Sequence, residues 1–283
     1  MAWKPTPHVP PFALQRGVKR RKKDEKAPKR RLQEARERWM VAAGLDACAA
    51  SAAAALVSPI IAVIDVAVVE NASGLRKLGE GMKHHGKKAL NSPSKFFASR
   101  EFQAVWALYA ATYATANWLD SYSRLKHTDA HLAKFAATTL VNLQMGITKD
   151  HAFTQMFSVV APHPFPLKCY ALFTLRDCIT MGASFSWTQD ASDWLQNVLG
   201  MDVSKADLTS QLGCPSISQL FTTPLHLLAV DIYNRPMVTN RGRLMFVKRE
   251  YPGTTAARVG RVGIAFGIGG VVNKMLVKAF NSI

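Results

Sequence analysis

The sequence predicts an all-α membrane protein with six transmembrane helices, arranged as three tandem two-helix repeats. The main observation is that three segments of 18 to 23 residues contain no Asp, Glu, Lys or Arg, namely residues 47–64, 102–119 and 208–230. A bilayer core is crossed by about 20 such residues. Strand signals, meaning alternating polarity bounded by turn residues, are scarce. Long uncharged segments in one chain therefore favour a helical membrane domain over a soluble core.

The six predicted helices follow these apolar segments along the chain. Their expected bounds are residues 39–69, 100–123, 130–148, 167–187, 208–233 and 257–280. The first is rich in alanine, which contributes little transfer energy but lets helices approach closely in lipid. We therefore expect this helix to pack among its neighbours. The glycines of the last helix lie at helical spacing and follow no strand, so they indicate helix packing rather than a nucleotide-binding loop.

The first 38 residues form a separate basic extension before the membrane domain of residues 39–280. They carry 13 basic and four acidic side chains, of a total net charge of +17, and no acidic residue precedes Asp24. Such a segment cannot bury a core, so we expect it to be disordered or helical at a surface. It fits a mitochondrial targeting segment best, then a surface for anionic lipid such as cardiolipin, and nucleic-acid binding least well. We expect lipid partners and no nucleic acid.

The predicted connections differ in charge. Residues 75–99 carry a net charge of +5 and residues 234–256 a net charge of +4, whereas residues 188–207 carry −3. Basic connections mark the matrix or cytoplasmic side of a multi-spanning protein. This asymmetry places the loops after the odd-numbered helices on that side and both termini on the opposite side. The basic N-terminal extension conflicts with this assignment, because its charge favours the matrix or cytoplasmic side.

No motif indicates an enzyme, a metal site or a cofactor. The four cysteines lie far apart without a CxxC pair, and they are best interpreted as small buried residues. The eight histidines show no ligand spacing, and the sequence contains no P-loop, HExxH or GxSxG motif.

A long internal period is visible at three positions. Pro59, Asn142 and Pro224 are separated by 83 and 82 residues, and each is expected near the end of an odd-numbered helix. A fixed period with one helix pair per unit indicates a tandem repeat. The predicted repeats cover about residues 39–125, 126–195 and 205–280.

Three repeats of two helices resemble the mitochondrial carrier family, solute carrier family 25. The resemblance covers about residues 39–280 and includes Arg176, Asp177, Gly182 and Phe185 on the fourth helix and Arg261 on the sixth. It implies a multi-pass protein of the mitochondrial inner membrane whose Arg residues face a central cavity. A charged pair within the membrane is also a candidate functional site on physical grounds.

The charges with which such carriers close their matrix gate are missing. The acidic and basic positions of that motif hold uncharged or weakly basic residues here, namely Ile61, Gln144, His226, Ile64, Ile147 and Ala229. None of the three expected ion pairs can form, and the second gate is almost as incomplete.

Two functional hypotheses follow. The first is a degenerate carrier that became a structural or accessory subunit of a mitochondrial membrane complex. The alternative is an active carrier of a small anionic or zwitterionic metabolite. In that case the substrate-binding residues would be Arg176, Asp177, Arg261, His226 and Asn117, with Thr112 also lining the cavity. A soluble helical protein that binds nucleic acid through its tail is a weaker third possibility.

Overall fold

The computed structural model describes the backbone of residues 11–280, and the side chains of residues 36–280 except position 185. This part of the chain is helical and contains no strand, which confirms the all-α prediction. The elements are α1 (Pro11–Ser73), α2 (Leu78–Asn91), α3 (Pro93–Phe97), α4 (Arg100–Lys126), α5 (His131–Met156), α6 (Leu167–Phe185), α7 (Trp187–Leu199), α8 (Val203–Asn234), α9 (Asn240–Val262), the π-helical segment η1 (Gly263–Gly269) and α10 (Gly270–Phe280).

Six long helices overlap the six predicted ones, and local signals set several of their ends. The Ser99 hydroxyl accepts a hydrogen bond from the Phe102 amide and caps α4, while Asp202 caps α8 in the same way. α1 ends where Gly74 adopts a left-handed conformation with φ of +83°. The predicted bounds of the second and fourth helices are therefore close to those of α4 and α6.

The sixth helix begins far earlier than predicted. The helix from Asn240 through η1 to Phe280 is continuous, although the sequence suggested a connection up to residue 256. Pro252 and several charged residues hid this part of the helix, but Pro252 is accommodated inside α9 and Thr239 caps its start. The other predicted connections also contain helices, since α2 and α3 follow α1 and α7 follows α6.

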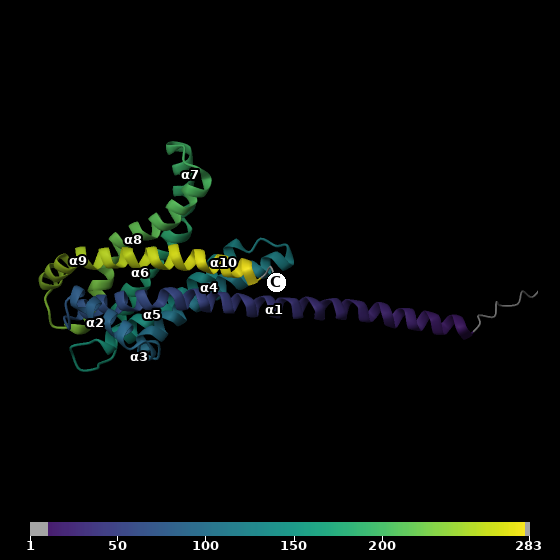
Figure 1. Cartoon of the computed structure of the whole chain (residues 1–283), viewed down its shortest axis with the longest axis horizontal. Coiled ribbons are helices and arrows are strands. Elements are labelled where there is room, and N and C mark those ends of the chain that lie inside the picture. The colour runs from purple at the N-terminus through teal and green to yellow at the C-terminus, as the bar shows by residue number, and fades with distance from the viewer. Residues whose placement is uncertain (1–10, 281–283) are drawn as a thin grey trace, which may run out of the picture.

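The bundle forms around α1. Figure 1 shows α1 and the α9–α10 helix lying lengthwise along each other, with the first part of α1 extending beyond the bundle and α7 projecting from it. The most extensive packing joins α1 to α4 and α6 to α8. Alanines of α1 such as Ala49, Ala50 and Ala53 are buried, so this helix packs among neighbours as its composition predicted.

Among residues 36–280, two helices are long and apolar enough to cross a membrane by length and composition: Arg36–Ser73 and Asn240–Phe280. The prediction of six transmembrane helices in three repeats is therefore not confirmed. Polar residues lower the hydropathy of the others. On α8, for example, Ser218, Gln219, Thr222 and Thr223 are fully buried and turned toward the bundle. α1 also runs without a break past residue 38, so that predicted domain boundary lies inside one helix.

Candidate functional site

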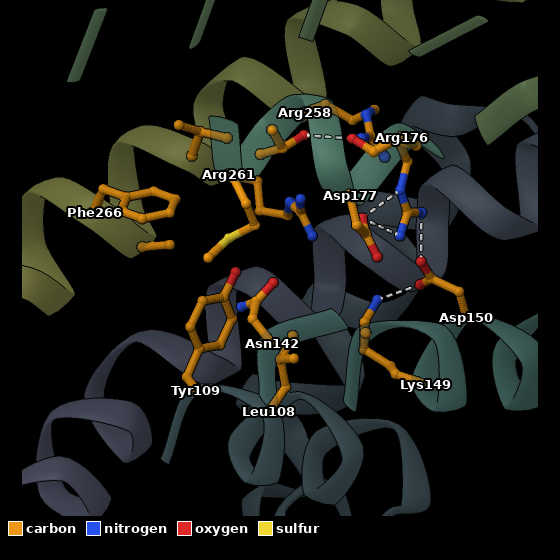
Figure 2. Close-up of a pocket in the computed structure, with 15 residues that line it drawn as sticks. Leu108, Tyr109, Asn142, Lys149, Asp150, Arg176, Asp177, Arg258, Arg261 and Phe266 are labelled. Atoms are coloured by element: carbon orange, nitrogen blue, oxygen red, sulfur yellow. Dashed lines mark hydrogen bonds and ion pairs between the residues drawn. The ribbon is translucent and has the colours of Figure 1, made fainter. Parts of the chain in front are cut away.

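A polar cavity of about 50 Å³ lies in the middle of the bundle (Figure 2). α4, α5, α6, α9 and η1 surround it. Its charged and polar lining consists of Tyr109, Asn142, Lys149, Asp150, Arg176, Asp177, Thr180, Arg258 and Arg261. A site for one water takes about 10–15 Å³, so the space corresponds to a few waters rather than to a metabolite.

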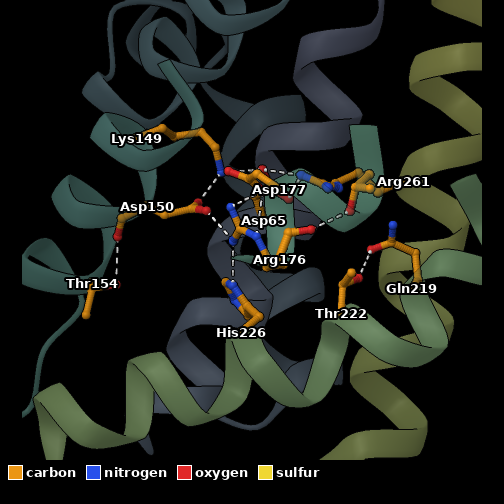
Figure 3. A network of polar contacts seen from close by, with 11 residues as sticks. Asp65, Lys149, Asp150, Thr154, Arg176, Asp177, Gln219, Thr222, His226 and Arg261 are labelled. Atoms are coloured by element: carbon orange, nitrogen blue, oxygen red, sulfur yellow. Dashed lines mark hydrogen bonds and ion pairs between the residues drawn. The ribbon is translucent and has the colours of Figure 1, made fainter. Parts of the chain in front are cut away.

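Six charged side chains around this cavity form one chain of alternating sign (Figure 3). In order of contact they are Arg261, Asp65, Lys149, Asp150, Arg176 and Asp177. Lys149 Nζ lies 2.8 Å from Asp65 Oδ2 and 2.5 Å from Asp150 Oδ1. Arg176 then bridges two carboxylates, with Nη1 2.5 Å from Asp150 Oδ2 and Nη2 2.5 Å from Asp177 Oδ1. The chain joins α1, α5, α6 and α9 and has no net charge.

Two adjacent pairs, Lys149–Asp150 on α5 and Arg176–Asp177 on α6, supply most of this chain. Neighbouring residues on a helix point about 100° apart. The two side chains of each pair contact each other, and Lys149, Asp150 and Arg176 also form ion pairs with a neighbouring helix. The Arg176 guanidinium also lies over the Phe173 ring, 5.0 Å from its centroid, an arrangement that favours a cation.

His226 of α8 approaches the same arginine. Its Nδ1 lies 3.0 Å from Arg176 Nη1. A guanidinium can only donate hydrogen bonds, so Nδ1 accepts and a neutral ring carries its proton on Nε2. Nε2 is buried and has no hydrogen-bond partner among the described residues. The neutral histidine therefore gives the Arg176 guanidinium a further hydrogen-bond acceptor and adds no charge to the cluster.

Arg258 is the exception in this network. It lies one helical turn before Arg261 and lines the cavity. The side chains described in residues 36–280 offer it no hydrogen bond or ion pair, and its Nε is buried without a partner. The cavity wall therefore has an excess of one positive charge over the neutral chain of six.

The structure brings together four of the five predicted substrate-binding residues. Arg176, Asp177 and Arg261 line the cavity, and His226 contacts Arg176. Asn117 lies elsewhere, where its amide exchanges hydrogen bonds with the Asn273 amide at 3.0 and 2.8 Å and donates to the Asp46 carbonyl. Their role in substrate binding stays a prediction.

The repeat positions do not form a common feature of the site. Asn142 lines the cavity and donates to Thr112 Oγ1 at 3.3 Å, but Thr112 itself is not among the lining residues. Pro59 and Pro224 are not among them either.

Four charged residues of the site were missed by the sequence reasoning: Asp65, Lys149, Asp150 and Arg258. The carrier motif places gate charges at fixed offsets from the repeat positions, whereas Asp65 and Lys149 lie six and seven residues beyond Pro59 and Asn142. A usable signal was present, because each of these charges is within a predominantly apolar helix or at its end.

Residues 49–281 match the family model described as "Probable citrulline exporter". The chain belongs to this family. No curated protein matches the sequence significantly. The match covers most of the described bundle and all the charged residues around the cavity, so the family description and the site concern the same part of the protein.

This family is different from the mitochondrial carriers, so the predicted membership of solute carrier family 25 is wrong. The resemblance rested on two prolines at a long period and on an Arg–Asp pair in a helix. Prolines that bend helices and paired intramembrane charges are general solutions to packing and burial. The absence of the expected gate charges is then no sign of degeneration, because this chain pairs other charges at other positions.

Proposed function

We propose that this chain is a membrane transporter that exports citrulline through the central cavity. The observation that carries the proposal is the cluster of charged side chains at the centre of a bundle whose family is described as probable citrulline exporters. Charged groups inside a membrane domain are costly and mark substrate or ion pathways. Family membership thus favours the transport hypothesis over that of an accessory subunit.

The cavity is closed to a metabolite of this size. Its volume of about 50 Å³ fits a few waters. Citrulline has 12 non-hydrogen atoms by its formula, so its volume is on the order of ten times that of one water molecule. Transport therefore requires that the helices around the cavity separate on alternate sides, which is the general principle of alternating access.

Two features of the helices suit such a movement. The continuous helix Asn240–Phe280 contains the π-helical segment η1, directly after Arg258 and Arg261. α8 contains Pro215 and Pro224, each of which removes a backbone hydrogen bond. π-helical segments often lie at functional sites, and both they and prolines are places at which a helix bends.

Efflux from liposomes tests this function. Purified protein is reconstituted in liposomes loaded with labelled citrulline, and the release of label is followed after dilution. We expect efflux for the wild type and its loss for Arg261→Ala. The matched control is Arg249→Ala on the same helix, whose side chain is 74% exposed; it should retain efflux. Citrulline release no faster than from protein-free liposomes would contradict the proposal.

We further propose that the protein lies in the mitochondrial inner membrane. The support is the basic character of residues 1–38, in which no acidic residue precedes Asp24. A fluorescent fusion of the full chain should co-localise with an inner-membrane marker, and a fusion that lacks residues 1–38 should not. Retention in another membrane by the full chain would refute this placement. Binding to cardiolipin and to other membrane subunits stays a prediction.

A further inference from the structure

Two oppositely charged groups of the cavity wall have unused hydrogen-bonding capacity. Arg258 is 4% exposed and has no polar partner within the described residues. The second group is Asp177, whose Oδ1 is held by Arg176 while its Oδ2 is buried without a partner. Figure 2 shows both residues at the same cavity. Buried polar atoms are normally paired, so each of these atoms indicates a missing ligand group.

The free donors match a carboxylate. A guanidinium presents a planar fork of N–H groups that complements two carboxylate oxygens. Arg261 contributes a further donor, because its Nη1 pairs with Asp65 while its Nε has no partner within the described residues. A carboxylate at this place would also give Arg258 the ion-pair partner that it lacks within the described residues.

The free oxygen of Asp177 matches an ammonium group. Gly146 of α5 faces it, and a Cβ at position 146 would lie 3.1 Å from Oδ2. A side chain at position 146 would therefore crowd this oxygen and any donor that pairs with it. An ionised carboxylate oxygen can only accept hydrogen bonds, so a ligand donor is needed here.

From these contacts we infer that the cavity is a zwitterion site that recognises the α-carboxylate and the α-ammonium group of an amino acid separately. Arg258, with Nε of Arg261, receives the carboxylate, and Asp177 Oδ2 receives the ammonium group. This inference rests on the proposed function and specifies which part of the substrate each side chain recognises. It assigns the ligand role to Arg258, which forms no ion pair within the described residues. Lys149 and Arg176, which each pair with two carboxylates, hold the helices together instead.

The experiment compares citrulline with two analogues, each of which lacks one charged group of citrulline. The analogues are the decarboxylated N-carbamoylputrescine and the deaminated ureidovaleric acid. Binding to the purified full chain in detergent is measured by titration calorimetry. We expect both analogues to bind about 10-fold or more weakly than citrulline, because each leaves a buried group of the site unpaired.

Variants then connect each ligand group to its residue. Arg258→Gln should abolish the preference for citrulline over the amine and keep the preference over the acid. Asp177→Asn should do the reverse. The control for the first is Arg249→Gln, an exposed arginine on the same helix, which should keep both preferences.

Gly146→Ala provides a second test of the ammonium subsite, since Asp177 also pairs with Arg176 and its substitution could disturb folding. The added methyl group crowds Asp177 Oδ2 and should weaken citrulline binding but not binding of the deaminated acid. Gly182→Ala on α6 is the matched control, because a Cβ there meets nothing within 4 Å.

The outcomes separate the two proposals. If the wild type binds all three ligands equally, or if Arg258→Gln weakens all three equally, the zwitterion site is refuted while citrulline transport stands. If the wild type binds none of them and shows no efflux, the proposed function itself fails.

Discussion

Asp65 on α1 and Arg261 on α9 form an ion pair across 196 residues of sequence, with Oδ1 of the aspartate 3.2 Å from Nη1 of the arginine. The same carboxylate accepts from Lys149 on α5. One side chain thus connects the first long helix with the third and the last. Both the stability of the bundle and the position of Arg261 at the cavity depend on this carboxylate.

Asp65→Asn should destabilise the protein strongly. The substitution leaves Lys149 with one carboxylate instead of two and removes the only ion-pair partner of Arg261 within the described residues. Breaking a buried ion pair by removal of one partner costs about 3–5 kcal/mol. Denaturant unfolding of the purified protein in detergent measures this loss.

Asp190→Asn is the control for this measurement. Asp190 is exposed on α7, and a surface substitution of this kind changes stability by about 0.5 kcal/mol or less. Equal unfolding midpoints for Asp65→Asn and Asp190→Asn would show that the buried chain of charges contributes nothing to stability.

The sequence predicted the helical fold well where apolar segments end at local signals. α4 and α6 begin at the predicted residues because Ser99 caps one and Pro166 precedes the other. The start of α9 was missed because Pro252 and the surrounding charges resemble a loop. Whether such a proline ends a helix depends on tertiary packing, which the local sequence does not contain.

The site was predicted in part for a similar reason. Arg176, Asp177 and Arg261 are conspicuous because charges in apolar helices carry a large burial cost. Their partners are not conspicuous, since Lys149 and Asp65 lie 84 residues apart in the sequence and on different helices. That Arg258 lacks such a partner is a property of the packed bundle alone.

Gly269→Ala should strain the junction between η1 and α10. A Cβ at position 269 would overlap the Tyr113 hydroxyl and lie 3.3 Å from Val57 Cγ1. Tyr113 donates to the Ala265 carbonyl of η1 at 2.7 Å, and it would have to move and lose this bond. We expect a loss of about 1–3 kcal/mol in unfolding free energy, as for other overpacked sites.

Gly270→Ala is the neighbouring control, because a Cβ there meets nothing within 4 Å. It should be neutral or stabilising by about 0.5–1 kcal/mol, the usual gain for alanine over glycine in a helix. Adding Tyr113→Phe to Gly269→Ala should recover part of the loss, since it removes the overlapping hydroxyl. A Gly269→Ala variant as stable as Gly270→Ala would contradict the close approach of α4 to η1.

Tyr251 and Pro224 should be energetically coupled. Pro224 has no N–H, so the Leu220 carbonyl one turn earlier on α8 lacks its helical donor. The Tyr251 hydroxyl of α9 donates to this carbonyl at 3.0 Å. Tyr251→Phe should therefore cost about 0.5–1.5 kcal/mol in the wild type. In a Pro224→Ala background the restored amide can reach Leu220, so the same substitution should cost less.

A double-mutant cycle on unfolding free energies measures the difference, with the exposed Tyr122 as the control for a Tyr→Phe change. Costs that agree within about 0.3 kcal/mol in the two backgrounds would show that the hydroxyl does not replace the missing helical bond.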